Sequence, residues 1–262
     1  MHGININRFF LNDQRSRKMA TIVTAFMTNI NNIEFRSYEK YIELGKNLLS
    51  QPVPIVCFLE KQIYDEYFSM DLTKFPLTIF KIFERNENYL YNYEHLLTEF
   101  DVQTDNPTKD TPGYMFTQCH KTEWVKMAIE DDDFHTTNFV WIDFGIFHMI
   151  RDDVHFAVAL KNLSRKTYEG VRIASCTDPS LPCLERNIYR QIMWYFAGSI
   201  FGGSKSALIA FADTMKQYTL DMIKEKKHIM WEVNIWYLLY QSHASLFNPY
   251  HANHNLSILE HY

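Results

Sequence analysis

Two short apolar runs with a helical pattern between them open the chain. ATIVTAF at 20–26 is rich in β-branched residues, and PIVCFLE at 54–60 is a second apolar run introduced by prolines. Between them, NNIEFRSYEKYIELGKNLL repeats apolar residues at the spacing of an amphipathic helix. A strand, a helix and a strand in this order predict the start of a parallel sheet, and hence an α/β fold.

The next part of the chain is less regular. Residues 61–100 read as helical pieces interrupted around Pro76 and at 85–88, and DVQTDNPTKDTPG at 101–113 reads as a polar surface loop. From Thr117 onward the pattern again predicts a helix, followed by the apolar strand FVWI and, later, the strand RIASC at 172–176. One face of this helix holds Lys121, Trp124, Val125 and Ala128.

The last third contains the most regular amphipathic helix, SKSALIAFADTMKQYTLDMIKEKK, whose apolar residues recur every three or four positions. A further helix is predicted from Trp231 to Tyr240, and NPYHANHNLSILEHY reads as a polar tail with histidines. Residues 1–18 are polar and predict an extension that precedes one domain over 19–262.

Composition narrows the class of protein. The 262 residues are 47% apolar, which predicts a compact chain with a full core. A net charge of −5 gives no electrostatic reason to expect nucleic acid as a partner. Four cysteines without a close pair predict reduced thiols and a cytoplasmic location. No apolar run reaches the roughly 18 residues of a membrane span, and no transmembrane segment is expected.

Polar residues stand at the ends of the apolar strands, where ligands gather in open α/β sheets. They are Thr24, Glu60 and Asp143. Asp143 either caps the next turn or binds a ligand, and a divalent cation would offset the cost of desolvating its carboxylate. Gly145, two positions on, would let the backbone approach a bound diphosphate closely.

Four segments resemble a known family. TIVTAF, HKTEWVKMAIE, VWIDFGI and AGSIFGGS are similar to the HtrL/YibB family of bacterial surface-polysaccharide proteins and, more distantly, to GT-A-fold glycosyltransferases. The resemblance spans roughly residues 20–240, and WIDFG is its most distinctive part. It implies a GT-A-like, Rossmann-type, mostly parallel sheet flanked by helices in a single domain. Similar proteins occur in large DNA viruses, for which the location would be the host cytosol.

The resemblance implies a metal site. GT-A enzymes use an Asp-x-Asp motif to hold Mn²⁺ or Mg²⁺ against the diphosphate of a nucleotide sugar, and Asp143 matches its first position. Gly145 replaces the second aspartate, which puts metal dependence in question. A histidine near the C-terminus often completes such sites, so His251 and His254 are candidate ligands, the alternative being that both are simply solvated.

The same resemblance suggests contacts to the donor nucleotide. Lys121 would contact the diphosphate, unless it is an exposed helix lysine. Thr24 and Ala25 would contact the base, and Glu60 the ribose or base. Gly202 and Gly203 would border the donor sugar and acceptor, although a plain turn explains them equally well.

Glu232 is the candidate general base. Its apolar neighbours in MWEVNIW would favour a carboxylate able to take a proton near neutral pH, and the alternative is a helix glutamate pointing to solvent. With Asp143 as the second catalytic residue, the resemblance implies a metal-assisted, inverting hexosyl- or pentosyltransferase. It would move a sugar from a nucleotide diphosphate, with UDP expected, to a glycan hydroxyl.

Two other functions stay open. A nucleotide-sugar or glycan binding protein without catalysis would fit the missing second aspartate. A phosphotransfer hydrolase with Asp143 as nucleophile fits less well, because such enzymes usually need a second acid where this chain has Gly145.

Overall fold

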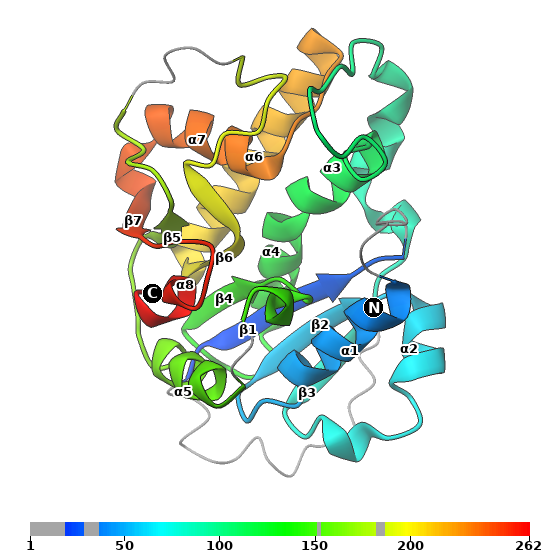
Figure 1. Cartoon of the computed structure of the whole chain (residues 1–262), viewed down its shortest axis with the longest axis vertical. Helices are drawn as coiled ribbons and strands as arrows, with labels where there is room; N and C mark the ends of the chain where they lie inside the picture. Colours follow the sequence, from blue (N-terminus) through cyan, green and yellow to red (C-terminus); the bar gives the residue numbers. More distant parts are fainter. Residues whose placement is uncertain (1–18, 29–36, 151–152, 182–186) are drawn as a thin grey trace.

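A seven-stranded mixed sheet runs through the centre of the computed structural model (Figure 1). The structure describes residues 19–28, 37–150, 153–181 and 187–262. The strand order is β3-β2-β1-β4-β6-β5-β7, and within these residues β6 is antiparallel to both of its neighbours while the other pairs are parallel. The strands are β1 (Thr21–Phe26), β2 (Ile55–Leu59), β3 (Thr78–Ile82), β4 (Asn138–Ile142), β5 (Val171–Ser175), β6 (Phe196–Ser204) and β7 (Phe247–His251).

Helices cover both faces of the sheet and make three layers (Figure 1). One apolar cluster joins one face to α3, α4, α6 and α7, and a second joins the other face to α1, α2, α5 and α8. The helices are α1 (Tyr38–Leu49), α2 (Lys61–Tyr67), α3 (Pro112–Cys119), α4 (Lys121–Asp131), α5 (Asp153–Leu163), α6 (Lys205–Lys226), α7 (Glu232–Ser242) and α8 (Ser257–Glu260).

The two clusters follow from the alternation of side chains along each strand. In β1, Ile22 belongs to one cluster and Val23 to the other, and Val140 and Trp141 divide in the same way in β4. Every residue of β2 and β4 is buried, as expected for parallel strands covered on both faces. The predicted α/β class, with a mostly parallel sheet flanked by helices, is therefore confirmed.

The strands predicted at 20–26, 54–60, 139–142 and 172–176 correspond to β1, β2, β4 and β5, and the predicted helices from 117, 204 and 231 are also present. The helix from 117 is divided by His120 into α3 and α4. For the helix over 31–49, the described part is α1, which begins after its cap Ser37.

Two predictions of local structure are wrong: the region 61–100 contains strand β3, and the expected polar tail forms β7 and α8. The glycine-bearing segment 197–204 lies within strand β6, which excludes the alternative of a plain turn. β3 and β7 are the two edges of the sheet. The sequence did not reveal them because Lys81 interrupts the apolar pattern of β3 and Pro249 that of β7. A proline is tolerated on an edge strand because fewer backbone donors are needed there.

The predicted extension, residues 1–18, lies outside the described residues. Among the residues that are described, no helix combines the length and apolar character needed to cross a membrane.

Candidate functional site

The site lies at the edge of the sheet where the parallel strands end. Asp143 directly follows β4, and its N–H donates a hydrogen bond to the carbonyl of Ser199 at 3.0 Å. Because β6 is antiparallel, its first residues lie beside the end of β4, and this brings Gly198 and Ser199 to the same edge. This is where ligands bind in open α/β sheets.

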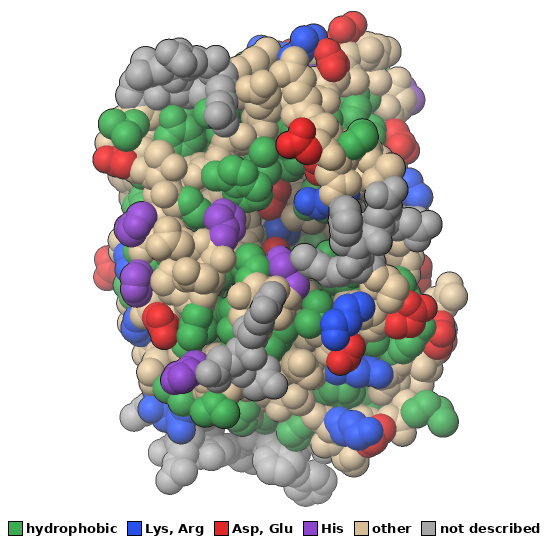
Figure 2. All heavy atoms as spheres, viewed as in Figure 1, with side chains coloured by type: hydrophobic (Ala, Val, Ile, Leu, Met, Phe, Trp, Pro, Cys, Tyr) green, Lys and Arg blue, Asp and Glu red, His purple; other side chains and the backbone are tan. Residues whose placement is uncertain are grey.

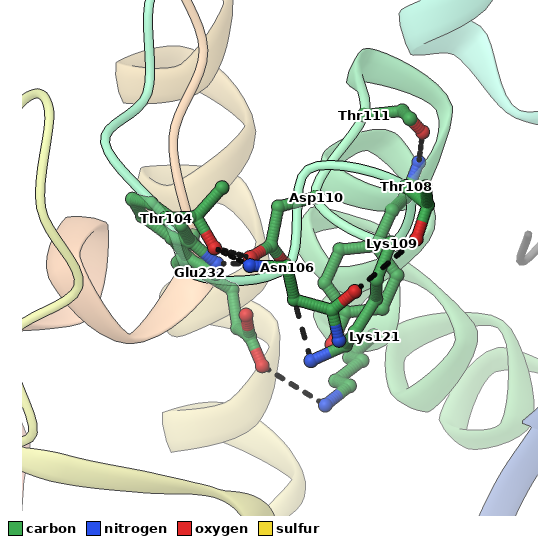
Figure 3. A network of polar contacts seen from close by, with 10 residues as sticks. Thr104, Asn106, Thr108, Lys109, Asp110, Thr111, Lys121 and Glu232 are labelled. Atoms are coloured by element: carbon green, nitrogen blue, oxygen red, sulfur yellow. Dashed lines mark hydrogen bonds and ion pairs between the residues drawn. The ribbon is translucent and has the colours of Figure 1, made fainter. Parts of the chain in front are cut away.

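Lys121 connects three segments at this edge. Its Nζ lies 2.9 Å from Asp143 Oδ1, 2.9 Å from Glu232 Oε1 and 2.9 Å from the carbonyl oxygen of Gly198. Figure 3 shows the contact with Glu232 from close by. An ammonium group has three N–H donors, so these contacts use all of them. We call Asp143, Lys121 and Glu232 the ion trio.

Local sequence explains why the ion trio meets here. Trp141 and Asp143 are two residues apart, so their side chains leave the chain on the same side, and the Trp141 indole N–H donates to Asp143 Oδ1 at 2.7 Å. Lys121 is the first residue of α4, whose buried side packs against β1 and β4. Glu232 is the first residue of α7, where the helix dipole favours a carboxylate.

Burial and charge decide the ionisation of the lysine. Lys121 is 3% exposed and Glu232 5%, which excludes the solvent-facing alternatives for both. Burial alone would lower the pKa of Lys121, but Asp143 and Glu232 outweigh it and raise the pKa above its usual value. The lysine is therefore an ammonium at neutral pH, and the ion trio retains one net negative charge.

The polar loop at 101–113 reaches this site, which the sequence did not reveal. Asp110 is buried, accepts hydrogen bonds from the Trp231 indole N–H at 3.2 Å and from the Thr104 hydroxyl, and lies near Glu232 and Lys121 (Figure 3). One feature of the sequence does indicate where this loop ends. Thr111 caps α3 and Pro112 lies in its first turn, so the loop ends directly at the start of that helix.

Tyr114 of α3 is a second residue that the sequence did not reveal. Its ring lies 4.7 Å from the Lys109 ammonium. Burial, and then the charges of Glu232 and Asp143, raise the pKa of the Tyr114 phenol well above its usual value. The hydroxyl therefore stays protonated at neutral pH and is able to donate a hydrogen bond.

Asp143 is the member of the ion trio that solvent can reach. Its side chain is 32% exposed, against 4% for Lys121 and 6% for Glu232. Figure 2 shows a hollow near the middle of one face of the molecule, with basic and acidic side chains at its floor. The Asp143 side chain makes no cap on the following turn, whose N-terminal residue is Gly145, so the capping alternative is excluded.

The residues predicted for the nucleotide base and ribose lie in β1 and directly after β2. Val23 pairs with Trp141 in the parallel register of β1 and β4, so Ala25, two residues further on, lies at the level of Asp143. Thr24 lies inside β1 rather than after it, because pairing with β2 continues to Phe26, and its buried hydroxyl has no hydrogen-bond partner among the described residues. Ala25 is partly buried against the core. Glu60 follows β2 as predicted, and it accepts hydrogen bonds from the N–H of Thr28, at 2.7 Å, and from its hydroxyl. Glu60 therefore fixes the chain after β1.

The structure does not bring Gly202 and Gly203 to the site. They pair with Val140 and Phe139 of β4, roughly 13 and 17 Å along the strand from Gly198. A Cβ at Gly202 would lie 2.2 Å from the Tyr262 hydroxyl, and one at Gly203 would lie 2.4 Å from a backbone carbonyl, so close packing explains both glycines. Gly198 is the glycine of this stretch that borders the ion trio.

Gly145 does lie beside Asp143, but a side chain there would meet Tyr41 of α1. A Cβ would lie 2.9 Å from the Tyr41 ring. The absence of a side chain at this position therefore accommodates an aromatic ring.

The expected metal ligands do not come together. His251 ends β7, which is three strands and roughly 14 Å across the sheet from β4. His254 packs its ring edge-on against Trp194 at 4.8 Å. Over the described part of the chain, no three His, Cys, Asp or Glu side chains are placed to hold a metal ion. Within the described residues the structure therefore shows no assembled set of protein ligands at Asp143, and binding of Mn²⁺ or Mg²⁺ stays a prediction.

Comparisons with known proteins give similarity of fold only. No family model matches the chain, and no curated protein sequence matches it, so the family resemblance remains an expectation from sequence. Among solved structures, mouse xyloside xylosyltransferase 1 in its apo form is similar at 8% identity and a TM-score of 0.42, covering 88% of this chain and 84% of that one. A 4-diphosphocytidyl-2C-methyl-D-erythritol synthase from Anaerococcus prevotii is similar at 9% identity and a TM-score of 0.44, covering 92% and 89%.

Proposed function

We propose that this chain is a glycosyltransferase that moves a sugar from a nucleotide diphosphate, UDP being the expected nucleotide, to a hydroxyl of a glycan acceptor. The observation that supports this most is the ion trio. Two carboxylates and an ammonium group meet at the ligand-binding edge of an α/β sheet, and Asp143 is open to solvent there.

In this proposal Glu232 is the general base. It takes the proton of the acceptor hydroxyl, the acceptor oxygen bonds to the anomeric carbon, and the bond to the diphosphate breaks with its electron pair leaving on the diphosphate. The oxygen of Glu232 other than Oε1 would act, because Oε1 is bound to Lys121. A single displacement of this kind inverts the anomeric configuration, which NMR of the product measures.

Lys121 has a positioning role in the proposal. Its three N–H donors already bind Asp143, Glu232 and Gly198, so a direct contact with phosphate would require it to give up one of them. It holds the two carboxylates at fixed positions before a ligand arrives, and such preorganisation lowers the cost of reaching the reactive arrangement. No step is assigned to Mn²⁺ or Mg²⁺, and transfer measured with and without each ion tests that expectation.

A nucleotide-sugar or glycan binding protein without catalysis is the second candidate. It is favoured by the same ion trio, because one oxygen of each carboxylate, including that of the proposed base, is already bound to Lys121. Release of nucleoside diphosphate from nucleotide sugars separates the two, since a binding protein would release none.

Thermal unfolding with a panel of nucleoside diphosphates and nucleotide sugars tests the donor site. A ligand that binds the native state raises the melting temperature. We expect at least one nucleotide to stabilise the wild type and to lose this effect in Asp143→Ala. If no nucleotide changes the wild type, or if the variant responds equally, the donor site has been assigned wrongly.

A further inference from the structure

The oxygens around the Lys121 ammonium are those that a hard divalent cation would use. They are one oxygen of each of two carboxylates and one backbone carbonyl oxygen, from Asp143, Glu232 and Gly198, all at 2.9 Å. Carboxylate and carbonyl oxygens are the ligands that Mg²⁺ and Mn²⁺ prefer in proteins. We call this arrangement the oxygen cage.

The oxygen cage comes from separate parts of the fold. Asp143 follows β4, Gly198 lies in β6 and Glu232 begins α7. Two of the three positions are fixed independently of the lysine: the Trp141 indole holds Asp143 Oδ1, and the pairing of β6 with β4 holds the Gly198 backbone. The start of α7 fixes the backbone of Glu232, and its carboxylate lies at the end of a flexible side chain. If the Lys121 side chain were removed, the Asp143 and Gly198 oxygens would therefore stay in place, and the Glu232 carboxylate would remain within reach of a cation between them.

We infer that the Lys121 ammonium occupies the cation position of this site, so that the native oxygen cage excludes a divalent metal and removal of the lysine side chain creates a metal site. A divalent ion added to the native cage would sit beside a buried ammonium of like charge. In Lys121→Ala, two carboxylates would face a space with no compensating charge, and a cation entering it would find the Asp143 and Gly198 oxygens in place and the Glu232 carboxylate within reach.

This inference does not depend on the proposed transferase activity, because cation binding is measured without nucleotide. Native protein, Lys121→Ala and the double variant Lys121→Ala/Asp143→Ala are titrated with Mn²⁺, followed by the EPR signal of free Mn²⁺. Tb³⁺ luminescence gives a second reading, since the Trp141 ring lies 5.9 Å from the ammonium and would sensitise an ion bound in its place.

We expect Lys121→Ala to bind Mn²⁺ at least about tenfold more tightly than native protein, and the double variant to lose that gain. Tb³⁺ emission excited through tryptophan should appear only in Lys121→Ala. Equal Mn²⁺ binding by native protein and Lys121→Ala would overturn the inference, as would a gain that survives in the double variant.

Loss of the lysine also destabilises the fold, so two further measurements keep the test decisive. If Lys121→Ala is unfolded in EDTA, recovery of its native circular dichroism on adding Mn²⁺ supports the inference. If Lys121→Ala stays unfolded, Mn²⁺ binding is compared between native protein and Asp143→Asn. Binding by native protein that Asp143→Asn abolishes contradicts the inference, and absence of binding in both proteins supports it.

Discussion

Gly198→Ala is expected to break the ion trio without touching any of its charges. A Cβ at Gly198 would lie 2.4 Å from Glu232 Oε1, whereas ordinary contacts begin at 3.4 Å. The carboxylate is the movable partner because it is the end of a flexible side chain. Glu232 must therefore move by about 1 Å, and movement away from Gly198 disrupts its 2.9 Å contact with Lys121.

The expected loss of stability follows from two opposing terms. A hydrogen bond to a charged group stabilises the native protein by about 1.5–3 kcal/mol. Replacing glycine by alanine stabilises it by about 0.4–1 kcal/mol, because alanine lowers the conformational entropy of the unfolded chain. The net change is roughly 0.5–2.5 kcal/mol, or a melting temperature lower by about 1–10 °C in a protein of this size. Misplacing a reactive group by about 1 Å costs on the order of 100-fold in rate.

Two comparisons test this explanation. Gly113→Ala, in helix α3, is the matched control, because its Cβ would meet the Tyr91 hydroxyl at an ordinary 3.4 Å, and we expect it to be neutral or slightly stabilising. In a Glu232→Ala background the Oε1 atom is gone, so Gly198→Ala should then cost much less. Thermal unfolding of the four proteins of this cycle measures the coupling. Equal losses in both backgrounds would show that Gly198 does not act through Glu232.

Three further outcomes are expected. Asp143→Asn keeps the shape of the side chain but removes the charge that binds Lys121, the residue that positions Glu232. Release of nucleoside diphosphate from a donor should therefore fall by about 100-fold, and unchanged release would remove Asp143 from the mechanism. Burial, with the charge of Lys216, lowers the pKa of His120 to about 3, so the unfolded chain gains a proton below its ordinary pKa of 6.5 while the native protein does not. Stability should therefore fall as pH decreases from 6.5 toward 3, by about 2 kcal/mol at pH 5. Denaturant titrations at pH 7.5 and 5 measure this loss, and the contribution of His120 to it should be absent from His120→Phe. Burial raises the pKa of the Cys57 and Cys119 thiols. A thiol reagent should therefore label neither cysteine in native protein and both in urea, which mass spectrometry of the peptides measures.

The parts of the site that the sequence predicted are those with a local signal. An apolar strand followed by Asp143 placed the carboxylate at the end of β4, and the helical pattern placed Lys121 on the buried face of its helix. Glu232 was identified from its apolar neighbours, which reflect its burial. In each case periodicity or strand position indicates the direction of the side chain before any tertiary contact is known.

The parts that the sequence could not predict depend on pairing between distant segments. Strand β6 contains three glycines and resembles a turn, and only its antiparallel pairing with β4 shows that Gly198, not Gly202 or Gly203, lies beside Asp143. The loop containing Asp110 is polar enough to read as solvent-exposed, yet Trp231 reaches it from 121 residues away. A one-residue change of register in β6 would alter which glycine faces the site, and composition does not determine register.

The ion trio also explains why burying charge here is compatible with a stable fold. A buried ion pair gains little over apolar packing, but removing one partner leaves an unpaired charge and is strongly destabilising. Lys121 bonds to groups after β4, within β6 and at the start of α7, which lie up to 111 residues from it in the sequence. Any arrangement that misplaces one of these segments leaves a charged or polar group without its partner. The ion trio therefore selects one relative position of the three segments, and this is the position that keeps Asp143 open to solvent.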